Sequence, residues 1–254
     1  MRQSPPRDLV WDGCLNVREL GGLPTTDGGE TRLGAVVRAD NVRRLSLAGW
    51  KTLVEHGVRT VVDLRSDHEL LEDPPADGSV EVRHVPFMQA SKAEWEKIDA
   101  ELDAVAAAAP DTATATRGIY LVLLERFKAN VATCIRAVID APEGGVVIHC
   151  AGGKDRTGLL AAFLLHAAGV AAPDIAADYA LSEERLRPRH EEWFEAAETE
   201  EELERLRRVA QTPYASMLGV LAALDERYGS VEAYLGSVGL TDDELDRVRA
   251  RLRG

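Results

Sequence analysis

The sequence predicts an α/β fold: a mainly parallel sheet of about four to five strands flanked by helices, with a helical C-terminal part at about residues 173–254. Three observations support this fold class. Short apolar runs typical of strands occur at residues 35–38, 58–64, 80–85 and 145–149. Helical patterns separate these runs, as in parallel α/β sheets. After residue 157 every patterned segment has helical spacing.

The expected helices each follow from apolar spacing and from local stop signals. Gly57 ends the first of them and Pro110 closes the second. The segment 157–168 is apolar on nearly all sides, which indicates a buried helix. The expected helices cover residues 46–56, 91–109, 117–140, 157–168, 174–181, 183–208, 213–228 and 241–252.

The charged helix expected at 183–208 has two interpretations. Its narrow apolar stripe would let it cover a pocket as a lid, but a solvated surface helix is slightly favoured. No internal repeat or linker interrupts the chain, so we expect one domain over residues 1–254.

Charge and hydropathy exclude several classes of partner. The net charge of −13 argues against a nucleic-acid partner, and no apolar run approaches the ~20 residues of a membrane span. We therefore expect no integral membrane association. The polar N-terminal residues lack a secretory signal, and the three cysteines lack disulfide-framework spacing. Both features favour a cytoplasmic location, with signal-less secretion left open. The oligomeric state is not indicated.

Residues 149–158, H-C-A-G-G-K-D-R-T-G, carry the strongest functional pattern. Cys150 ends a predicted strand, where open α/β sheets place ligands. The glycines let backbone amides turn toward an anion, and the next helix adds its positive end, which favours a reactive thiolate. Arg156 offers a planar fork for two phosphate oxygens. We expect phosphate to contact Ala151, Gly152, Gly153, Lys154, Asp155 and Arg156.

This pattern predicts a metal-independent phosphomonoesterase with a phosphocysteine intermediate and no cofactor. A nucleotide-binding Walker loop is excluded, because Ile148 and Asp155 occupy positions that would need glycine and serine or threonine. A glycine turn beside an inert cysteine is the disfavoured alternative. His149 is expected to fix the loop backbone from behind, and Thr157 to donate a hydrogen bond to the sulfur.

The 149–158 segment resembles the signature loop of the cysteine-dependent protein tyrosine phosphatases. It is most similar to an atypical bacterial group of tyrosine/serine phosphatases that also act on phosphoinositides. Four more blocks are similar to that group: N-V-R-E-L-G-G at 16–22, R-A-D at 38–40, V-D-L-R-S at 62–66 and Y-G-S-V-E-A-Y-L at 228–235. The departures are Val17, Glu19 and Gly152, and none of them removes a reactive group.

The resemblance implies that Cys150 is the nucleophile and that Arg156 holds the phosphoryl group of a phosphorylated protein, peptide or phosphoinositide. It also favours Asp155, inside the loop, as the general acid and base. A lysine at the position of Lys154 goes with phosphoinositide activity in that group. The other acid candidates, Asp111 and Asp140, lie in no recognisable acid-loop motif.

Three polar residues at predicted strand ends have open roles. Asp63 is either a second acid candidate or, as we favour, an anchor for Arg65. Asp40 and Arg38 either approach the pocket or form a strand-end ion pair. The rival functions are a rhodanese-like sulfurtransferase, an arsenate reductase, which would need a second thiol near Cys150, and a phosphate-binding regulatory module.

Overall fold

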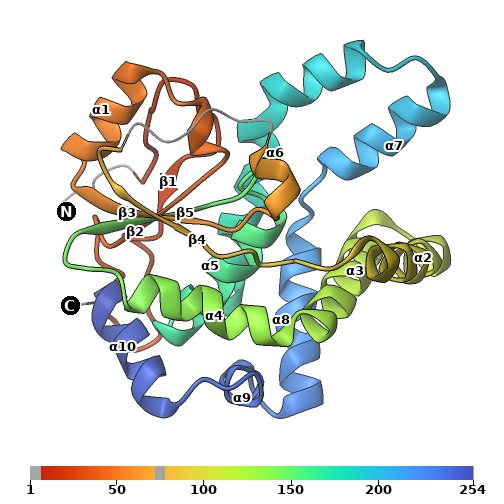
Figure 1. The fold of residues 1–254 in the computed structure, drawn as a ribbon. Coiled ribbons are helices and arrows are strands. Elements are labelled where there is room, and N and C mark those ends of the chain that lie inside the picture. Colours follow the sequence, from red (N-terminus) through yellow and green to blue (C-terminus); the bar gives the residue numbers. More distant parts are fainter. Residues whose placement is uncertain (1–6, 72–77, 254) are drawn as a thin grey trace.

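The computed structural model describes residues 7–71 and 78–253 and has an α/β architecture. Its five-stranded sheet has the order β1-β2-β5-β3-β4, and only the β1–β2 pair is antiparallel (Figure 1). The predicted fold class is confirmed. The strands are β1 (Arg18–Glu19), β2 (Val36–Ala39), β3 (Val58–Asp63), β4 (Glu81–His84) and β5 (Gly145–His149). All but the two-residue β1 were predicted.

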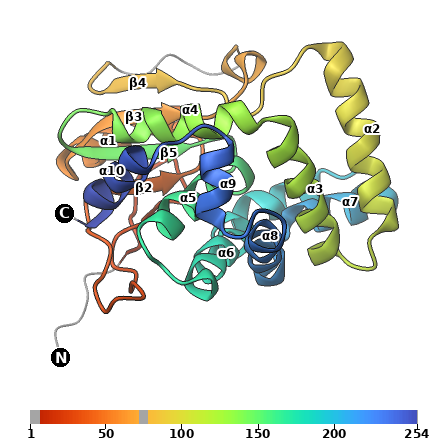
Figure 2. The ribbon, with the colours of Figure 1, turned by 90° about the horizontal axis from the view of Figure 1, so that it is seen from below.

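Strand β5 lies in the middle of the sheet and is buried on both faces. Val146 and Ile148 pack on the side of helices α4 (Lys128–Ile139) and α5 (Asp155–Ala167), whereas Val147 packs on the side of α1 (Leu47–Glu55). Figures 1 and 2 show α1 over one face and α4, α5 and α10 (Asp242–Arg253) over the other. Helices on both faces explain why every residue of β5 is buried.

The segment 117–140, predicted as one helix, forms two. Helix α3 (Thr112–Arg126) follows α2 (Lys92–Ala108), and α4 begins after a break at Phe127, whose φ of −112° and ψ of 28° are not helical. The apolar spacing continues across the break because both helices bury one side in the same core, so spacing alone did not reveal it.

The boundaries predicted between residues 174 and 208 are also wrong. Helix α6 (Ala172–Glu195) continues through Pro188, and the chain then reverses at residues 196–199 into α7 (Glu200–Ala210). Thr199 caps α7 by accepting a hydrogen bond from the backbone N–H of Glu202. Helices α8 (Tyr214–Tyr228) and α10 match predictions, and α9 (Val231–Ser237) was not predicted.

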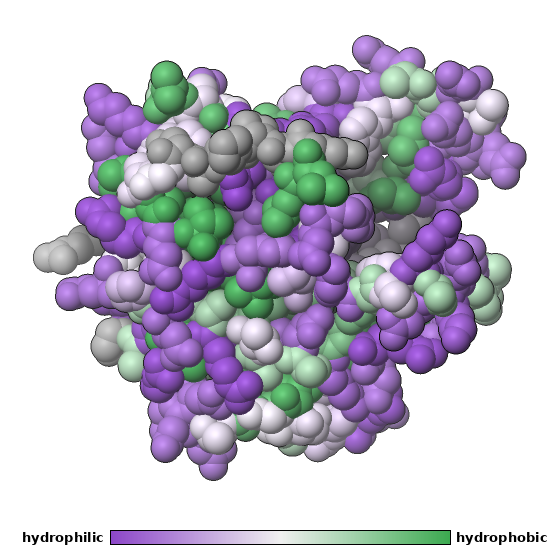
Figure 3. Space-filling model, in the orientation of Figure 1, coloured by the Kyte–Doolittle hydropathy of each residue, from purple (hydrophilic) through white to green (hydrophobic). Residues whose placement is uncertain are grey.

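Two helix pairs project from the same side of the molecule. One is the α6–α7 hairpin and the other is α2 with α3 (Figure 1). In the space-filling view the surface is hollowed between them (Figure 3). Within the described residues, no helix has both the length and the apolar character needed to cross a bilayer.

A buried ionic cluster joins α6 to the sheet. Asp178 of α6 accepts hydrogen bonds from Arg18 of β1 at 3.0 Å, from Arg38 of β2 at 2.7 Å and from Arg7 at 2.5 Å. Burial by itself would raise the pKa of Asp178, but Arg18 and Arg38 lower it below its ordinary value. The carboxylate therefore stays ionised and neutralises cations that would otherwise be buried without a counterion.

Replacing Asp178 with Asn should lower the free energy of unfolding by about 3–5 kcal/mol, because it leaves buried arginines without their anion. Urea denaturation followed by circular dichroism measures the change. The matched control is Glu184→Gln, which removes an exposed carboxylate from the same helix and should change stability little. Equal stability of the two variants would contradict the role of the cluster.

Candidate active site

The loop formed by residues 150–156, called here the 150–156 loop, connects β5 to α5 and is held by its carbonyl oxygens. The backbone N–H of Asn41 donates to the carbonyl of Ala151 at 3.1 Å. The side-chain amide of Asn16 donates to the carbonyls of Gly152 and Gly153 at 3.0 and 3.2 Å. Asn16 comes from the first sequence block, so that block supports the loop from behind.

Gly153 makes the tightest contact of the loop with the sheet. Its carbonyl also accepts a hydrogen bond from Arg38 at 2.7 Å, and its φ of +64° is in the left-handed region. A Cβ at this position would lie 2.3 Å from the carbonyl oxygen of Ala39. Only glycine satisfies both constraints.

The loop carbonyls are hydrogen-bonded to Asn16, Arg38 and Asn41 behind the loop, so the loop N–H groups point the other way and remain available for a ligand. Throughout the described parts of the chain, no atom accepts a hydrogen bond from the backbone N–H groups of residues 151–156. Helix α5 begins within the loop at Asp155 and adds its positive end. Cys150 lies at the start of this loop and is only 2% exposed. The arrangement supports an anion next to a cysteine sulfur.

The guanidinium of Arg156 is held by a carboxylate that sequence reasoning missed. Its two terminal nitrogens bind the two oxygens of Glu69, in the 3-10 helix η2 (Asp67–Leu70), at 2.5 and 2.8 Å. Burial by itself would raise the pKa of Glu69, but Arg156 lowers it to about 2. For Arg156 the signs are reversed: burial by itself would lower its pKa, but Glu69 and the nearby Cys150 raise it. Glu69 thus orients the fork of Arg156.

One signal in the sequence could have pointed to Glu69. Ser66 follows a strand, and its backbone N–H donates to Glu69 three residues later, which is the spacing of a capping box. That spacing predicts a helical turn but not its arginine partner.

A pocket of about 530 Å³ opens over Asp155 and Arg156. One wall comes from η2, through residues such as Glu69. Another wall comes from Met88, in the segment before α2, and from α2 and α3, and it is mostly apolar, with Trp95, Ile119, Tyr120 and Leu123. The pocket therefore combines charged groups, among them Arg156, with a wall suited to an apolar or aromatic group.

Asp155 and Lys154 form an ion pair but have different hydrogen-bond partners. A carboxylate oxygen of Asp155 accepts a hydrogen bond from the hydroxyl of Tyr120 at 2.5 Å. The ammonium of Lys154 donates to the backbone carbonyl of Val209 at the end of α7, and lies 3.7 Å from Asp155. Lys154 thus connects the loop to the α6–α7 hairpin. Leu186 of that hairpin is buried and lies beside Gly152.

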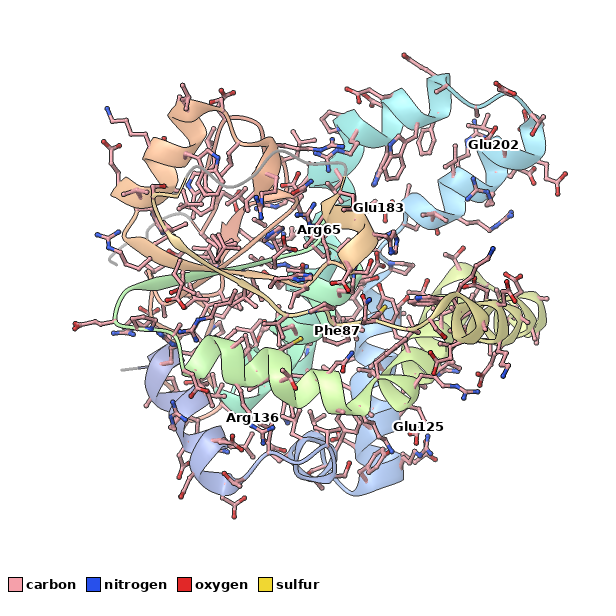
Figure 4. All side chains as sticks on the ribbon, in the orientation of Figure 1. Arg65, Phe87, Glu125, Arg136, Glu183 and Glu202 are labelled. Atoms are coloured by element: carbon pink, nitrogen blue, oxygen red, sulfur yellow. The ribbon has the colours of Figure 1, made fainter. Side chains whose placement is uncertain are left out.

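Asp63 makes the contact expected of an anchor. It accepts hydrogen bonds from the backbone N–H and the guanidinium of Arg65, whose side chain lies at the end of the sheet that faces α6 (Figure 4). Burial alone would raise the pKa of Asp63, but His149 and Arg65 lower it.

His149 Nδ1 lies 3.2 Å from the carbonyl of Cys150. In the described chain the buried hydroxyl of Thr157 has no hydrogen-bond partner, so the expected bond to the sulfur is not formed.

Asp40 and Arg38 satisfy neither of the two interpretations considered for them. Asp40 accepts hydrogen bonds from the backbone N–H groups of Leu15 and Asn16, and pairs with Arg189 at 2.9 Å. Arg38 binds the loop and Asp178 instead. Both residues support the back of the 150–156 loop rather than the open pocket.

The acid candidates outside the loop have structural partners. Asp111 is the N-cap of α3 and accepts a hydrogen bond from the backbone N–H of Thr114. Asp140 ends α4 and pairs with Arg247 at 2.6 Å. Neither lines the pocket, and of the carboxylates proposed from sequence only Asp155 does so.

Cys150 and Arg156 lie at the two ends of a loop whose N–H groups have no partner among the described residues, and the loop follows a central parallel strand. Such an arrangement is typical of the tyrosine phosphatase class. The chain belongs to the tyrosine phosphatase family, whose family model matches residues 9–254. It is 30% identical to a putative tyrosine-protein phosphatase of Cupriavidus necator, over 97% of this chain and 87% of that protein.

Two further relatives are similar at the same level. A tyrosine-protein phosphatase of Nostoc commune is 29% identical over 86% of this chain and 74% of its own length. The triple specificity protein phosphatase PtpB of Mycobacterium tuberculosis is 29% identical over 95% of this chain and 98% of its own length. The resemblance inferred from the sequence blocks is confirmed at the level of the family.

The depressed pKa of Glu69 predicts a pH-dependent contribution to stability. A folded-state pKa of about 2, below the ordinary 4.5, means that the contribution is complete above pH 4.5 and is lost as the pH falls toward 2. The difference in unfolding free energy between the wild type and Glu69→Gln should narrow from pH 6 to pH 3. Denaturant titrations at several pH values measure it, and a constant difference would contradict the coupling to Arg156.

Proposed function

We propose that this chain is a metal-independent phosphomonoesterase that hydrolyses phosphotyrosine. In the first step the Cys150 thiolate attacks phosphorus, the P–O bond to the tyrosyl oxygen breaks, and Asp155 gives that oxygen a proton. In the second step Asp155 accepts a proton from water as the water oxygen bonds to phosphorus and the S–P bond breaks. Arg156 and the loop N–H groups stabilise the negative charge that both steps carry.

The observation that carries this proposal is the orientation of the 150–156 loop. Its carbonyls are bonded outward, through Asn16, Arg38 and Asn41, and its N–H groups are unpaired within the described chain. Such a loop offers several fixed donors to one anion without reorganisation. Arg156 adds two more donors and is held in place by Glu69.

The apolar wall of the pocket supports phosphotyrosine as the first substrate class. Trp95, Ile119 and Leu123 offer contact area to a phenyl ring, which a phosphoserine side chain cannot use. Lys154 already donates a hydrogen bond to the carbonyl of Val209, so it has fewer hydrogen bonds to offer a phosphoinositide head group than a free lysine would. Phosphoserine, phosphothreonine and phosphoinositides are therefore secondary candidates. One relative is named a triple specificity phosphatase, which gives reason to test them.

Phosphate release from a phosphotyrosine peptide, a phosphoserine peptide and a phosphoinositide vesicle, with EDTA present, tests the proposal. We expect the phosphotyrosine peptide to react fastest, with no effect of EDTA, and Cys150→Ser to lose activity. Asp155→Asn should lower the rate on phosphotyrosine about 100-fold or more. Inhibition by EDTA, or activity that survives in Cys150→Ser, would overturn the mechanism. Thiosulfate turnover without phosphate release would favour a sulfurtransferase, and phosphate binding without turnover a regulatory module.

Trp95→Ala should raise KM for a phosphotyrosine peptide about tenfold, because the phenyl ring loses apolar contact worth about 1.4 kcal/mol. KM for a phosphoserine peptide should change less than about twofold. Steady-state kinetics on both peptides with one enzyme preparation separates this effect from partial unfolding, which would reduce the active fraction for both substrates alike. Equal increases in KM for both peptides would argue against a ring contact at this wall.

A further inference from the structure

A chain of two buried tyrosines reaches the carboxylate of Asp155. The Tyr120 hydroxyl, on α3, lies 2.5 Å from Asp155 Oδ1 and 2.8 Å from the hydroxyl of Tyr179, on α6. Tyr120 is 2% exposed and Tyr179 is 1% exposed, whereas the Asp155 side chain is 47% exposed. The chain thus runs from the interior to a carboxylate that meets solvent and substrate.

The fold holds both rings firmly. The ring centroids of Tyr120 and Tyr179 are 6.1 Å apart and the ring planes cross at 84°, an edge-to-face arrangement. Gly158, in the first turn of α5, leaves room for Tyr179: a Cβ there would lie 3.0 Å from the Tyr179 ring. The glycine that ends the 149–158 segment therefore makes space for a side chain from α6.

The hydrogen bonds of this chain have one direction when Asp155 is ionised. A carboxylate only accepts, so Tyr120 donates its single hydrogen to Asp155, and Tyr179 must then donate to Tyr120. Burial and the nearby Asp155 raise the pKa of both phenols, so both keep their protons. With Oδ1 facing Tyr120, the acid proton of Asp155 is left to the other oxygen, Oδ2.

We propose that Tyr120, itself oriented by Tyr179, is a positioning residue that turns Asp155 so that its second carboxyl oxygen exchanges the proton with the substrate. This inference rests on the proposed phosphatase function and on Asp155 as its acid. The tyrosines gain and lose no proton over the cycle. Asp155 passes its proton to the leaving oxygen and recovers one from the attacking water. Other ionisable groups around the site are Cys150, Lys154, Arg156, His68, Glu69 and Asp99.

The test compares leaving groups that differ in basicity. A phosphotyrosine peptide releases a phenol of pKa ≈ 10 and needs the acid, whereas p-nitrophenyl phosphate releases a much weaker base and needs it less. Tyr120→Phe should lower kcat/KM about tenfold on the peptide, since one hydrogen bond to a charged group is lost, and less than about twofold on p-nitrophenyl phosphate. Tyr179→Phe should give the same pattern with a smaller loss.

Two further measurements separate positioning from a structural role. On phosphotyrosine, the alkaline limb of the pH–rate profile should move to higher pH in Tyr120→Phe, because the ionised carboxylate has lost a hydrogen-bond donor. In an Asp155→Asn background, Tyr120→Phe should cause no further loss. Tyr228→Phe is the matched control, because its hydroxyl also donates to a carboxylate, that of Glu125, outside the pocket. It should leave kcat/KM unchanged.

The outcomes distinguish this inference from the proposed function. An inactive wild type, or an active Cys150→Ser variant, overturns the proposed function itself. Unimpaired Asp155→Asn overturns the choice of acid and the positioning role with it. The positioning role alone is overturned if the wild type is active but Tyr120→Phe lowers kcat/KM equally on both substrates. It is also overturned if the losses of Tyr120→Phe and Asp155→Asn multiply in the double variant.

Discussion

The outward bonding of the carbonyls in the 150–156 loop is the constraint on which the rest of the site depends. A peptide unit cannot direct its N–H toward an anion unless its C=O points away, and a buried C=O without a partner is costly. Asn16, Arg38 and the backbone of Asn41 supply those partners. Each comes from a segment far from the loop in sequence, so the anion site exists only when the sheet is assembled.

This support has its own electrostatic cost. Arg18 and Arg38 are fully buried, and Asp178 on α6 is the carboxylate that binds them both. Removing either the arginines or the carboxylate from such a cluster leaves the remaining charge unpaired in a low-dielectric interior. The same α6 carries Tyr179, adjacent to Asp178. One helix therefore both neutralises the cations behind the loop and, through Tyr179, hydrogen-bonds to the Tyr120 hydroxyl that contacts Asp155.

The net charge of −13 means that an anionic substrate must be bound through short-range contacts in the site. Long-range forces would repel a phosphorylated substrate, so attraction must come from groups within hydrogen-bond range. In the proposed reaction Arg156 and the loop N–H groups provide it, and Glu69 holds the Arg156 guanidinium in a fixed orientation. The apolar wall beside Arg156 supports the proposed preference for a phosphate ester that carries a ring.

The parallel strands, the Cys150 to Arg156 spacing and the flanking sequence blocks were sufficient to predict the fold class and the family, because they depend on local periodicity and on contiguous residues. Local patterns were less informative where the chain reverses. The break at Phe127 and the turn at 196–199 follow from how helices pack, not from a strong stop signal.

By itself, then, the sequence determined the nucleophile candidate, its arginine and the glycine-rich turn between them, since these are neighbours along the chain. Only the tertiary structure decided what orients them. Glu69 reaches Arg156 from 87 residues away, and Tyr120 reaches Asp155 from 35. Side-chain partners of this kind depend on which helix faces cover the sheet edge, and no periodicity along the chain specifies such a pairing.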